Sequence, residues 1–185
     1  MGRVSDKRAR LMESAAKLFH HAGFNQTSIA DIAQDSGVPL GNVYYYFKTK
    51  NDLASAIIEQ RQNTLKGWAE EWEKNPDPRE RLFKLIDFQI SMKDTIAKYG
   101  CPIGSLCQEL DKGRQPIAHE ADGLLHWILQ WVTGQFRQMG QAKAEQLGIQ
   151  VVSTLQGICI VSNALNDPQV VATELARLKS WIRQM

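Results

Sequence analysis

The sequence predicts an all-α protein, in which a three-helix N-terminal domain is followed by a larger helical bundle. Three observations lead to this prediction. Apolar residues recur at intervals of three and four along most of the chain, as they do on one face of a helix. Glycines and prolines interrupt that pattern where helices are expected to end or begin. The length of 185 residues suits one substantial core, or a small domain fused to a larger one.

One stretch near the N-terminus is expected to form two short helices joined by a tight turn. Thr27 or Ser28 can cap the first of them, because a hydroxyl accepts a hydrogen bond from an unpaired N–H at a helix start. Gly37 ends it, since glycine adopts the left-handed conformation at no steric cost. The second runs from about Leu40 to Phe47. This arrangement is typical of a helix-turn-helix, whose second helix fits the major groove of DNA.

The outward residues of this motif suit a DNA surface. Asn42 can donate and accept at a base edge, and Gly41 permits a close approach of the backbone. Tyrosine hydroxyls and lysine ammonium groups suit phosphate oxygens, which position a protein without specifying sequence. Spacing alone leaves open an ordinary helical hairpin with a tyrosine-rich surface. The predicted DNA-binding residues are Thr27, Ser28, Leu40, Gly41, Asn42, Tyr44, Tyr45, Lys48 and Lys50.

About the first 55 residues resemble the N-terminal DNA-binding signature of the TetR family of repressors. The resemblance rests on residues at fixed spacing: Phe19, Gly23, Phe24, Thr27, Ser28, Ile32, Ala33, Gly37, Val38, Gly41, Tyr44, Tyr46, Phe47, Lys50 and Leu53. It implies a homodimeric repressor of double-stranded operator DNA, with a variable second half that binds a small-molecule effector. Many members carry a polar, base-contacting side chain where Leu40 and Gly41 stand, so Asn42 is expected to carry most of the direct readout.

The expected domains are residues 1–48, a helix-turn-helix DNA-binding domain, and residues 49–185, a ligand-binding and dimerisation domain. The net charge is +2, and residues 1–52 contain seven Lys or Arg against five Asp or Glu. This basic bias fits nucleic acid at the N-terminal end. The basic residues Arg3, Lys7, Arg8 and Arg10 could reach phosphates or simply form a solvated helix end.

The sequence favours a cytoplasmic protein with no membrane contact. The first ten residues are charged and run into a helical pattern, unlike a signal or transit peptide. The hydrophobic fraction is 43%, and no apolar run is expected to reach the ~18 residues that span a membrane. Three cysteines, an odd number, argue against a disulfide framework.

The second half is expected to contain helices over residues 49–72, 79–98, 116–139, 142–165 and 169–183, with Asn75–Pro78 as the first break. The helix over 142–165 is apolar almost all round, so it must be covered on both sides. The last two helices therefore exceed what one subunit's core needs. They predict a homodimer with a four-helix interface.

The segment Tyr99–Asp111 is the other informative stretch. Gly100 ends one helix and Pro102 is expected to open the next, which places Cys101 at a helix N-terminus, where a thiol pKa is lowered. Cys101 is then a buried small hydrophobe, a redox or electrophile sensor, or a metal ligand. No metal or cofactor is expected. The segment also resembles the ligand domain of TetR-family branches that respond to electrophiles or aromatic compounds.

The predicted effector is a small, mostly apolar, planar or electrophilic molecule. The residues expected to bind it are Phe83, Ile86, Cys101, Cys107, Trp127 and Trp131. Two alternatives to a regulator stand beside this prediction: a cysteine-dependent enzyme with His119 or His126 as base, and a helical adaptor with a vestigial helix-turn-helix. The sequence contains no phosphate loop and no HExxH motif, so we expect a regulator and not an enzyme.

Overall fold

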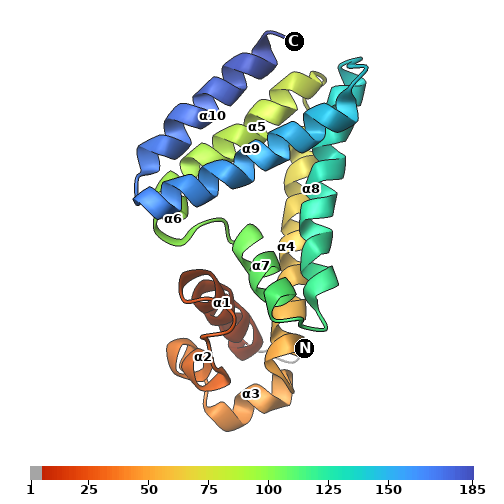
Figure 1. The fold of residues 1–185 in the computed structure, drawn as a ribbon. Helices are drawn as coiled ribbons and strands as arrows, with labels where there is room; N and C mark the ends of the chain where they lie inside the picture. Colours follow the sequence, from red (N-terminus) through yellow and green to blue (C-terminus); the bar gives the residue numbers. More distant parts are fainter. Residues whose placement is uncertain (1–5) are drawn as a thin grey trace. The chain divides into compact units, whose positions relative to one another are not determined.

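A computed structural model describes residues 6–185, which form ten α-helices and no strand (Figure 1). The all-α prediction is confirmed. Arg3, for which phosphate contact and a solvated helix end are both left open, lies outside the described residues. The helices are α1 (Asp6–His21), α2 (Ile29–Ser36), α3 (Leu40–Tyr46), α4 (Lys50–Trp72), α5 (Pro78–Ser91), α6 (Lys93–Tyr99), α7 (Gly104–Lys112), α8 (Ala118–Gln138), α9 (Ala144–Leu165) and α10 (Pro168–Arg183).

The chain divides into two compact units. The N-terminal unit contains the described residues up to Thr64 together with Ser105–Leu124. It therefore holds α1, α2, α3, the first part of α4, nearly all of α7 and the start of α8. The C-terminal unit contains Leu65–Gly104 and Leu125–Met185. The expected functional boundary at residue 48 falls inside the N-terminal unit and stays a prediction.

The helix predicted from Arg79 to Lys98 is two helices in the structure, α5 and α6, which meet at Met92. The N–H of Met92 donates to the carbonyl of Gln89 at 3.1 Å, and the Ser91 hydroxyl donates to the carbonyl of Phe88 at 2.6 Å. A serine hydroxyl on a nearby carbonyl competes with regular helical hydrogen bonding. The sequence has no glycine or proline at this break, so the apolar spacing continues across it.

The start of α7 also differs from the prediction, because the helix begins at Gly104 and not at Pro102. Cys101 lies three residues ahead of the helix, and its sulfur accepts a hydrogen bond from the N–H of Gly104 at 3.3 Å. The sulfur thus occupies the role of a capping acceptor for an otherwise unpaired N–H.

Buried side chains from several helices form the core of the N-terminal unit. The rings of Phe19 and Phe24 meet edge to face with their centroids 5.1 Å apart, where α1 gives way to the α1–α2 loop. Such aromatic pairs add to the stability that burial supplies. The same unit buries Leu11, Ala15, Ile32, Val38, Val43, Phe47, Leu53 and Ile57. One face each of α2 and α3 is thereby fixed, and the opposite faces remain at the surface.

The start of α2 settles which hydroxyl caps it. Ser28 is the N-cap: its hydroxyl accepts from the N–H of Asp31 at 3.1 Å, and its own N–H donates to the Asp31 carboxylate at 2.8 Å. This reciprocal arrangement is a capping box. The hydrogen bonds from the Ser28 side chain and backbone lower the pKa of Asp31. Thr27 instead is buried, 3% exposed, and its hydroxyl donates to the carbonyl of Gly23 at 2.7 Å.

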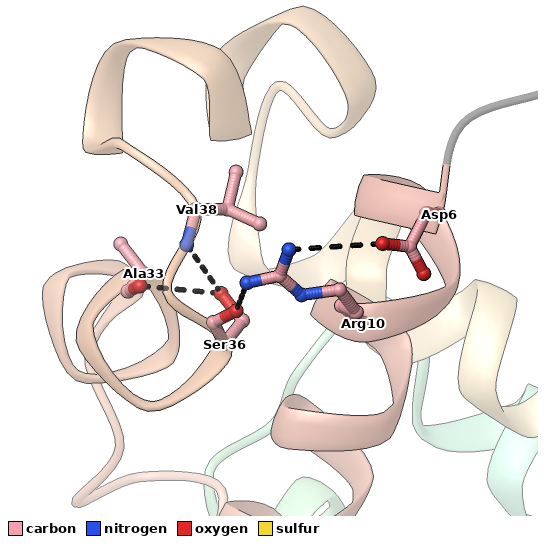
Figure 2. A network of polar contacts seen from close by, with 5 residues as sticks. All are labelled: Asp6, Arg10, Ala33, Ser36 and Val38. Carbon is pink, nitrogen blue, oxygen red and sulfur yellow. Dashed lines mark hydrogen bonds and ion pairs between the residues drawn. The ribbon is translucent and has the colours of Figure 1, made fainter.

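The turn between α2 and α3 is held from α1 (Figure 2). The Arg10 guanidinium donates to the carbonyl of Ser36 and pairs with Asp6 at 3.7 Å. The Ser36 hydroxyl accepts from the N–H of Val38 at 3.3 Å, within the turn itself. Gly37 has the predicted left-handed conformation, with φ 62°, and a Cβ atom there would lie 2.8 Å from the Arg10 guanidinium. The turn therefore requires glycine for two separate reasons.

Lys50 holds the loop between α1 and α2. Its ammonium group donates to the carbonyls of Phe24, at 2.8 Å, and of Thr27, at 3.0 Å, and lies 4.3 Å from the centroid of the Phe24 ring. Burial lowers the pKa of Lys50, and the negative charge of Glu109 opposes that shift. These contacts occupy the ammonium group inside the N-terminal unit, which differs from the phosphate contact predicted for it.

Glu109, on α7, holds the same loop from a second direction. Its carboxylate accepts from the N–H of Asn25 at 3.0 Å. A Cβ atom on Gly23 would lie 2.6 Å from that carboxylate, and Gly23 has a left-handed φ of 92°. The loop that connects α1 to α2 is therefore fixed by Lys50 at the start of α4 and by Glu109 on α7.

The C-terminal unit has a core of its own, to which α5, α8, α9 and α10 contribute. Its buried side chains include Leu82, Phe83, Ile86, Val132, Phe136, Val151, Leu155, Val171, Leu175 and Leu178. The Arg81 guanidinium is buried at one end of this core and donates to the Gln135 and Gln138 side chains and to the carbonyl of Asn75. Its burial is thus accompanied by hydrogen bonds, as a buried charge requires.

Helix α9 has an apolar surface on both sides, as predicted, but only one side is covered. Val151, Leu155 and Ile158 are buried, whereas Ile160 is 59% exposed. The other exposed apolar residues of α9 are Ile149, Val161 and Leu165. By length and composition α9 would suffice to cross a membrane, although a third of its most apolar stretch is buried. The expectation that no such run exists was therefore wrong.

Replacing Gly37 by alanine should lower the free energy of unfolding by about 1–2 kcal/mol, because the left-handed conformation strains any residue with a Cβ atom. The displaced Arg10 guanidinium adds to that cost. Gly41→Ala is the matched control, since a Cβ atom there meets open space and the residue is helical. That change should stabilise by about 0.5–1 kcal/mol. Urea denaturation followed by circular dichroism measures both, and equal effects would contradict the assigned role of Gly37.

Candidate nucleic-acid interface

Helix α3 presents one buried face and one exposed face. Val43 is fully buried, and α3 packs against α2. On the other face, Leu40 is 44% exposed and Tyr45 78% exposed, and Tyr44 is similarly open. Large apolar and aromatic side chains left exposed on one short helix indicate a surface made for contact.

The first turn of α3 contains the residues predicted to approach bases. Gly41 is exposed, with open space where a side chain would stand. Asn42 is half-buried beside it, and its N–H donates to the carbonyl of Pro39 at 2.8 Å. The first residues of a recognition helix are the ones that reach base edges in a major groove. The ring of Tyr45 leans edge-on against that of Tyr46, with centroids 5.0 Å apart.

The polar residues after α3 flank this surface. Lys48 is exposed. Thr49 caps α4 in a second capping box, because its hydroxyl accepts from the N–H of Asp52 at 3.0 Å and its own N–H donates to the Asp52 carboxylate at 2.9 Å. Ser28 is also exposed, at the start of α2. A helix N-terminus attracts phosphate oxygens.

The structure corrects two of the predicted DNA-binding residues. Thr27 is buried with its hydroxyl on Gly23, so no polar atom of its side chain faces outward for a phosphate. Lys50 is turned to the carbonyls of Phe24 and Thr27. Both residues shape the loop that orients α2. The exposed or half-exposed members of the predicted set are Ser28, Leu40, Gly41, Asn42, Tyr44, Tyr45 and Lys48.

Basic residues of α1 also have structural roles. The Arg8 guanidinium lies 5.2 Å from the centroid of the Phe47 ring, and Arg10 bonds to Ser36. Lys17 pairs with Asp35, and this ion pair, with a hydrogen bond from Ser14, lowers the pKa of Asp35. Sequence reasoning missed these roles because charge alone does not say which way a side chain turns.

Five of the six predicted effector residues lie in the C-terminal unit, and Cys107 lies in the N-terminal unit. Phe83 and Ile86 are buried in the core of the C-terminal unit, and Lys179 and Arg183 lie 5.1 and 5.4 Å from the centroid of the Phe83 ring. Both residues therefore pack as core residues, and their contact with an effector stays a prediction. Apolar residues that line a pocket and apolar residues that fill a core recur at the same helical spacing. The sequence therefore could not distinguish a pocket residue from a core residue here.

The two predicted tryptophans are half-buried in the C-terminal unit. The indole N–H of Trp131 donates to Glu73 at 2.8 Å, and its ring lies 5.5 Å from that of Trp72. Trp72 in turn stacks near Trp68, which contacts Phe88 at 4.3 Å between centroids. The structure thus adds an aromatic cluster that the prediction did not contain. Surface hollows elsewhere include one of about 1070 Å³ between α1 and α4, and one along α10.

The two cysteines predicted to bind an effector lie in different units. Cys107 is buried in the N-terminal unit, whereas Cys101 is half-buried in the C-terminal unit. The thiol of Cys101 is hydrogen-bonded to Cys159 on α9. Sequence reasoning missed Cys159, because it lies in an apolar helix far along the chain and no local pattern marks it. The described residues contain no group of three or more potential metal-ligating side chains.

Comparison with known proteins agrees with this geometry. Residues 11–57 match the family described as bacterial regulatory proteins, tetR family. The chain is 27% identical over 170 residues to the HTH-type transcriptional regulator LmrA of Bacillus subtilis, covering 85% of this chain and 86% of LmrA. It is 32% identical over 85 residues to the HTH-type transcriptional regulator TtgR of Pseudomonas putida, covering 45% of this chain and 40% of TtgR.

Solved structures share the fold of the whole chain. A TetR transcriptional regulator from Legionella pneumophila has a TM-score of 0.84 at 20% identity, covering 99% of this chain and 98% of its own. The reduced form of NemR from E. coli has a TM-score of 0.79 at 14% identity, covering 95% and 96%. These relatives are named as transcriptional regulators, which agrees with the helix-turn-helix described above. Residues 11–57 thus match the DNA-binding segment of the tetR family of bacterial regulatory proteins, and the whole chain is similar to transcriptional regulators and has the fold of TetR-family structures.

Proposed function

We propose that this protein is a cytoplasmic repressor that binds a pseudo-palindromic operator as a homodimer and releases it when a small effector is sensed. The observation that carries the DNA part is the exposed face of α3, with Leu40, Gly41, Asn42, Tyr44 and Tyr45 outward while Val43 is fully buried. The family supplies the general role, and the residues of this face supply the detail.

Direct readout is assigned mainly to the first turn of α3. The amide of Asn42 can pair with the N6 and N7 atoms of adenine. The exposed methyl groups of Leu40 can contact a thymine methyl, and Gly41 leaves room for the backbone to approach. Tyr44, Tyr45, Ser28 and Lys48 contact phosphates and fix the register of the helix in the groove.

The dimer is assigned to α9 and α10. Exposed apolar residues on α9 include Ile149, Ile160, Val161 and Leu165. The hollow along α10 is lined by small residues four apart, Ala172, Ala176 and Ser180, which allow a second helix to approach closely. Two copies related by a two-fold axis would cover these apolar surfaces with each other. A partner copy also accounts for the membrane-like length and composition of α9 in a DNA-binding protein.

The effector is proposed to be a small apolar, aromatic or electrophilic molecule that acts on the C-terminal unit. Support comes from the half-buried Trp127 and Trp131 and from Cys101, which lies just before α7. The effector must bind the DNA-releasing state more tightly, because equal affinity for both states shifts nothing.

Asn42→Ala should cost about 1–3 kcal/mol on the operator and relax base preference at one position of each half-site. Fluorescence anisotropy with operator variants, after footprinting of the flanking genomic DNA, measures this. Gln60→Ala, which changes an exposed residue of α4, is the control and should bind as the parent does. An unchanged base preference in Asn42→Ala would contradict the assigned recognition turn.

Lys48→Met and Lys50→Met form a matched pair of neighbouring lysines. Lys48→Met should weaken binding to all duplexes alike and reduce the salt slope by about one unit. Lys50→Met should leave that slope unchanged but lower stability by about 1.5–3 kcal/mol, because two carbonyls lose a charged donor. The reverse result, a lower slope for Lys50→Met with full stability, would restore Lys50 as a phosphate contact.

Ile160→Lys should convert the dimer to a monomer at micromolar concentration, because burying an unpaired ammonium group in the interface is costly. Sedimentation equilibrium measures the change. Leu40→Lys is the matched control, since it places the same charge on another exposed apolar residue and should leave the dimer intact. A monomeric parent protein would refute the dimer, and a dimeric Ile160→Lys would refute its assignment to α9.

A further inference from the structure

Cys101 and Cys159 form a thiol pair within the C-terminal unit. Cys101 lies in the link between α6 and α7, and Cys159 lies on the buried face of α9. Their side chains are hydrogen-bonded to each other. Cys101 is half-buried, whereas Cys159 is 1% exposed. The pair therefore has one half-buried member and one fully buried member.

The surroundings of the pair favour one thiolate and one thiol. The Cys101 sulfur accepts from the S–H of Cys159, from the N–H groups of Gly104 and Ile103 and from the Gln156 side chain. These donors lower the pKa of Cys101 and outweigh desolvation, which acts in the opposite direction. The pKa of Cys159 is raised, because its proton bonds to Cys101 and a second buried negative charge would meet the first. The S–H of Cys159 has a second acceptor in the side-chain oxygen of Gln89, at 3.7 Å, so its proton is placed between Cys101 and Gln89.

We propose that Cys101 and Cys159 are a redox site that closes to an intramolecular disulfide when a hydroperoxide reaches Cys101. The disulfide itself does not depend on the proposed function. Only its effect, the release of DNA, rests on that function. Cys107, the third cysteine, is buried in the N-terminal unit and is not part of this site. Thiolate character and partial exposure together are what make a cysteine the first target of an oxidant.

The chemistry takes two steps and balances with the peroxide alone. The Cys101 thiolate attacks the terminal oxygen of ROOH, so that an S–O bond forms and the O–O bond breaks. The departing alkoxide takes a proton from water, and Cys101 becomes a sulfenic acid. The sulfur of Cys159 then attacks the Cys101 sulfur; the S–S bond forms, the S–O bond breaks, and the hydroxide leaves as water with the Cys159 proton. Two thiols lose two electrons, which the peroxide gains, and a small dithiol reverses the reaction.

Closure must move Cys101 more than Cys159. A disulfide brings the sulfur atoms to about 2.05 Å, closer than any sulfur hydrogen bond. Cys159 is fixed in α9 between core residues such as Leu155 and Ser162, both of which are buried. Cys101 lies in a non-helical link and is free of that constraint. The moving residue is therefore the one whose sulfur accepts from Gly104, the first residue of α7.

The consequence reaches the N-terminal unit through α7 itself. When the Cys101 sulfur turns to Cys159, the N–H of Gly104 loses its acceptor and the first turn of α7 must readjust. The same helix carries Glu109, whose carboxylate accepts from Asn25 in the loop before α2 and acts electrostatically on Lys50. A change at the start of α7 is thus conveyed along one continuous helix to the contacts that orient α2.

The test uses the reduced 185-residue chain, treated with an equimolar amount of cumene hydroperoxide, alkylated and analysed as peptides by mass spectrometry. We expect one cross-linked peptide pair containing Cys101 and Cys159, with Cys107 fully alkylated. Cys159→Ser should stop at a Cys101 sulfenic acid that dimedone traps, Cys101→Ser should form no cross-link, and Cys107→Ser should behave as the parent. A cross-link through Cys107, a disulfide between subunits or no cross-link in the parent protein would overturn the proposal.

Two variants at position 159 distinguish a hydrogen bond to the Cys101 sulfur from mere packing of the two side chains. Cys159→Ser retains a hydrogen-bond donor to Cys101, whereas Cys159→Ala removes it. Without this donor the pKa of Cys101 rises. A smaller fraction of the Cys101 thiol is then ionised at pH 7. Iodoacetamide should therefore alkylate Cys101 several-fold more slowly in Cys159→Ala than in Cys159→Ser at pH 7. Equal rates would refute the paired thiolate.

Anisotropy on the operator tests the output separately. Oxidised parent protein should bind at least tenfold more weakly than reduced protein and recover with dithiothreitol, while Cys159→Ser should not change on brief oxidation. A disulfide with unchanged DNA affinity would overturn the coupling through α7. Reduced protein that binds no operator would overturn the proposed function, whereas the peptide masses would still decide the thiol pair.

Discussion

The contact between the Lys50 ammonium group and the carbonyls of Phe24 and Thr27 is the interaction on which the DNA-reading surface depends. A short loop cannot bury its carbonyls without partners, and a lysine at the start of α4 supplies them. The loop fixes the start of α2, α2 carries the turn at Gly37, and that turn sets the direction of α3. A single charged side chain thereby links the first turn of the long helix α4 to the orientation of the recognition helix.

Arg10 provides the complementary contact from α1. Its guanidinium donates to the carbonyl of Ser36. The guanidinium occupies the space that a side chain at Gly37 would otherwise fill. Hydrogen bonds from charged donors are stronger than neutral ones, and the resulting geometry is correspondingly rigid. The basic residues near the N-terminus thus serve the architecture of the motif as much as its charge. The remaining contact surface is largely aromatic and polar, which suits selective binding better than broad attraction to a polyanion.

The sequence was sufficient wherever a feature depends on neighbouring residues. Glycine at position 37, serine at 28 and the apolar spacing of Val43 and Phe47 each predict a local conformation, and the structure has all of them. It was insufficient where a side chain chooses between distant partners. Nothing local turns Lys50 inward or brings Cys159 to Cys101. The burial of Phe83 shows the same limit, since core and pocket walls have one periodicity.

The N-terminal unit is built from two separate segments of the chain, which limits where the chain can be cut to make a chimera. Designers of chimeric regulators commonly wish to join the DNA-reading segment of one protein to the sensor of another. Here a graft cut at residue 48 would omit Lys50, Leu53 and Ile57, and one cut at Thr64 would still omit Glu109. The recipient's own helix would then face the loop at Asn25 with an unmatched side chain. A DNA-binding module transferred from this chain must therefore include α7. Its DNA specificity can be moved to another protein only as two separate segments of the chain.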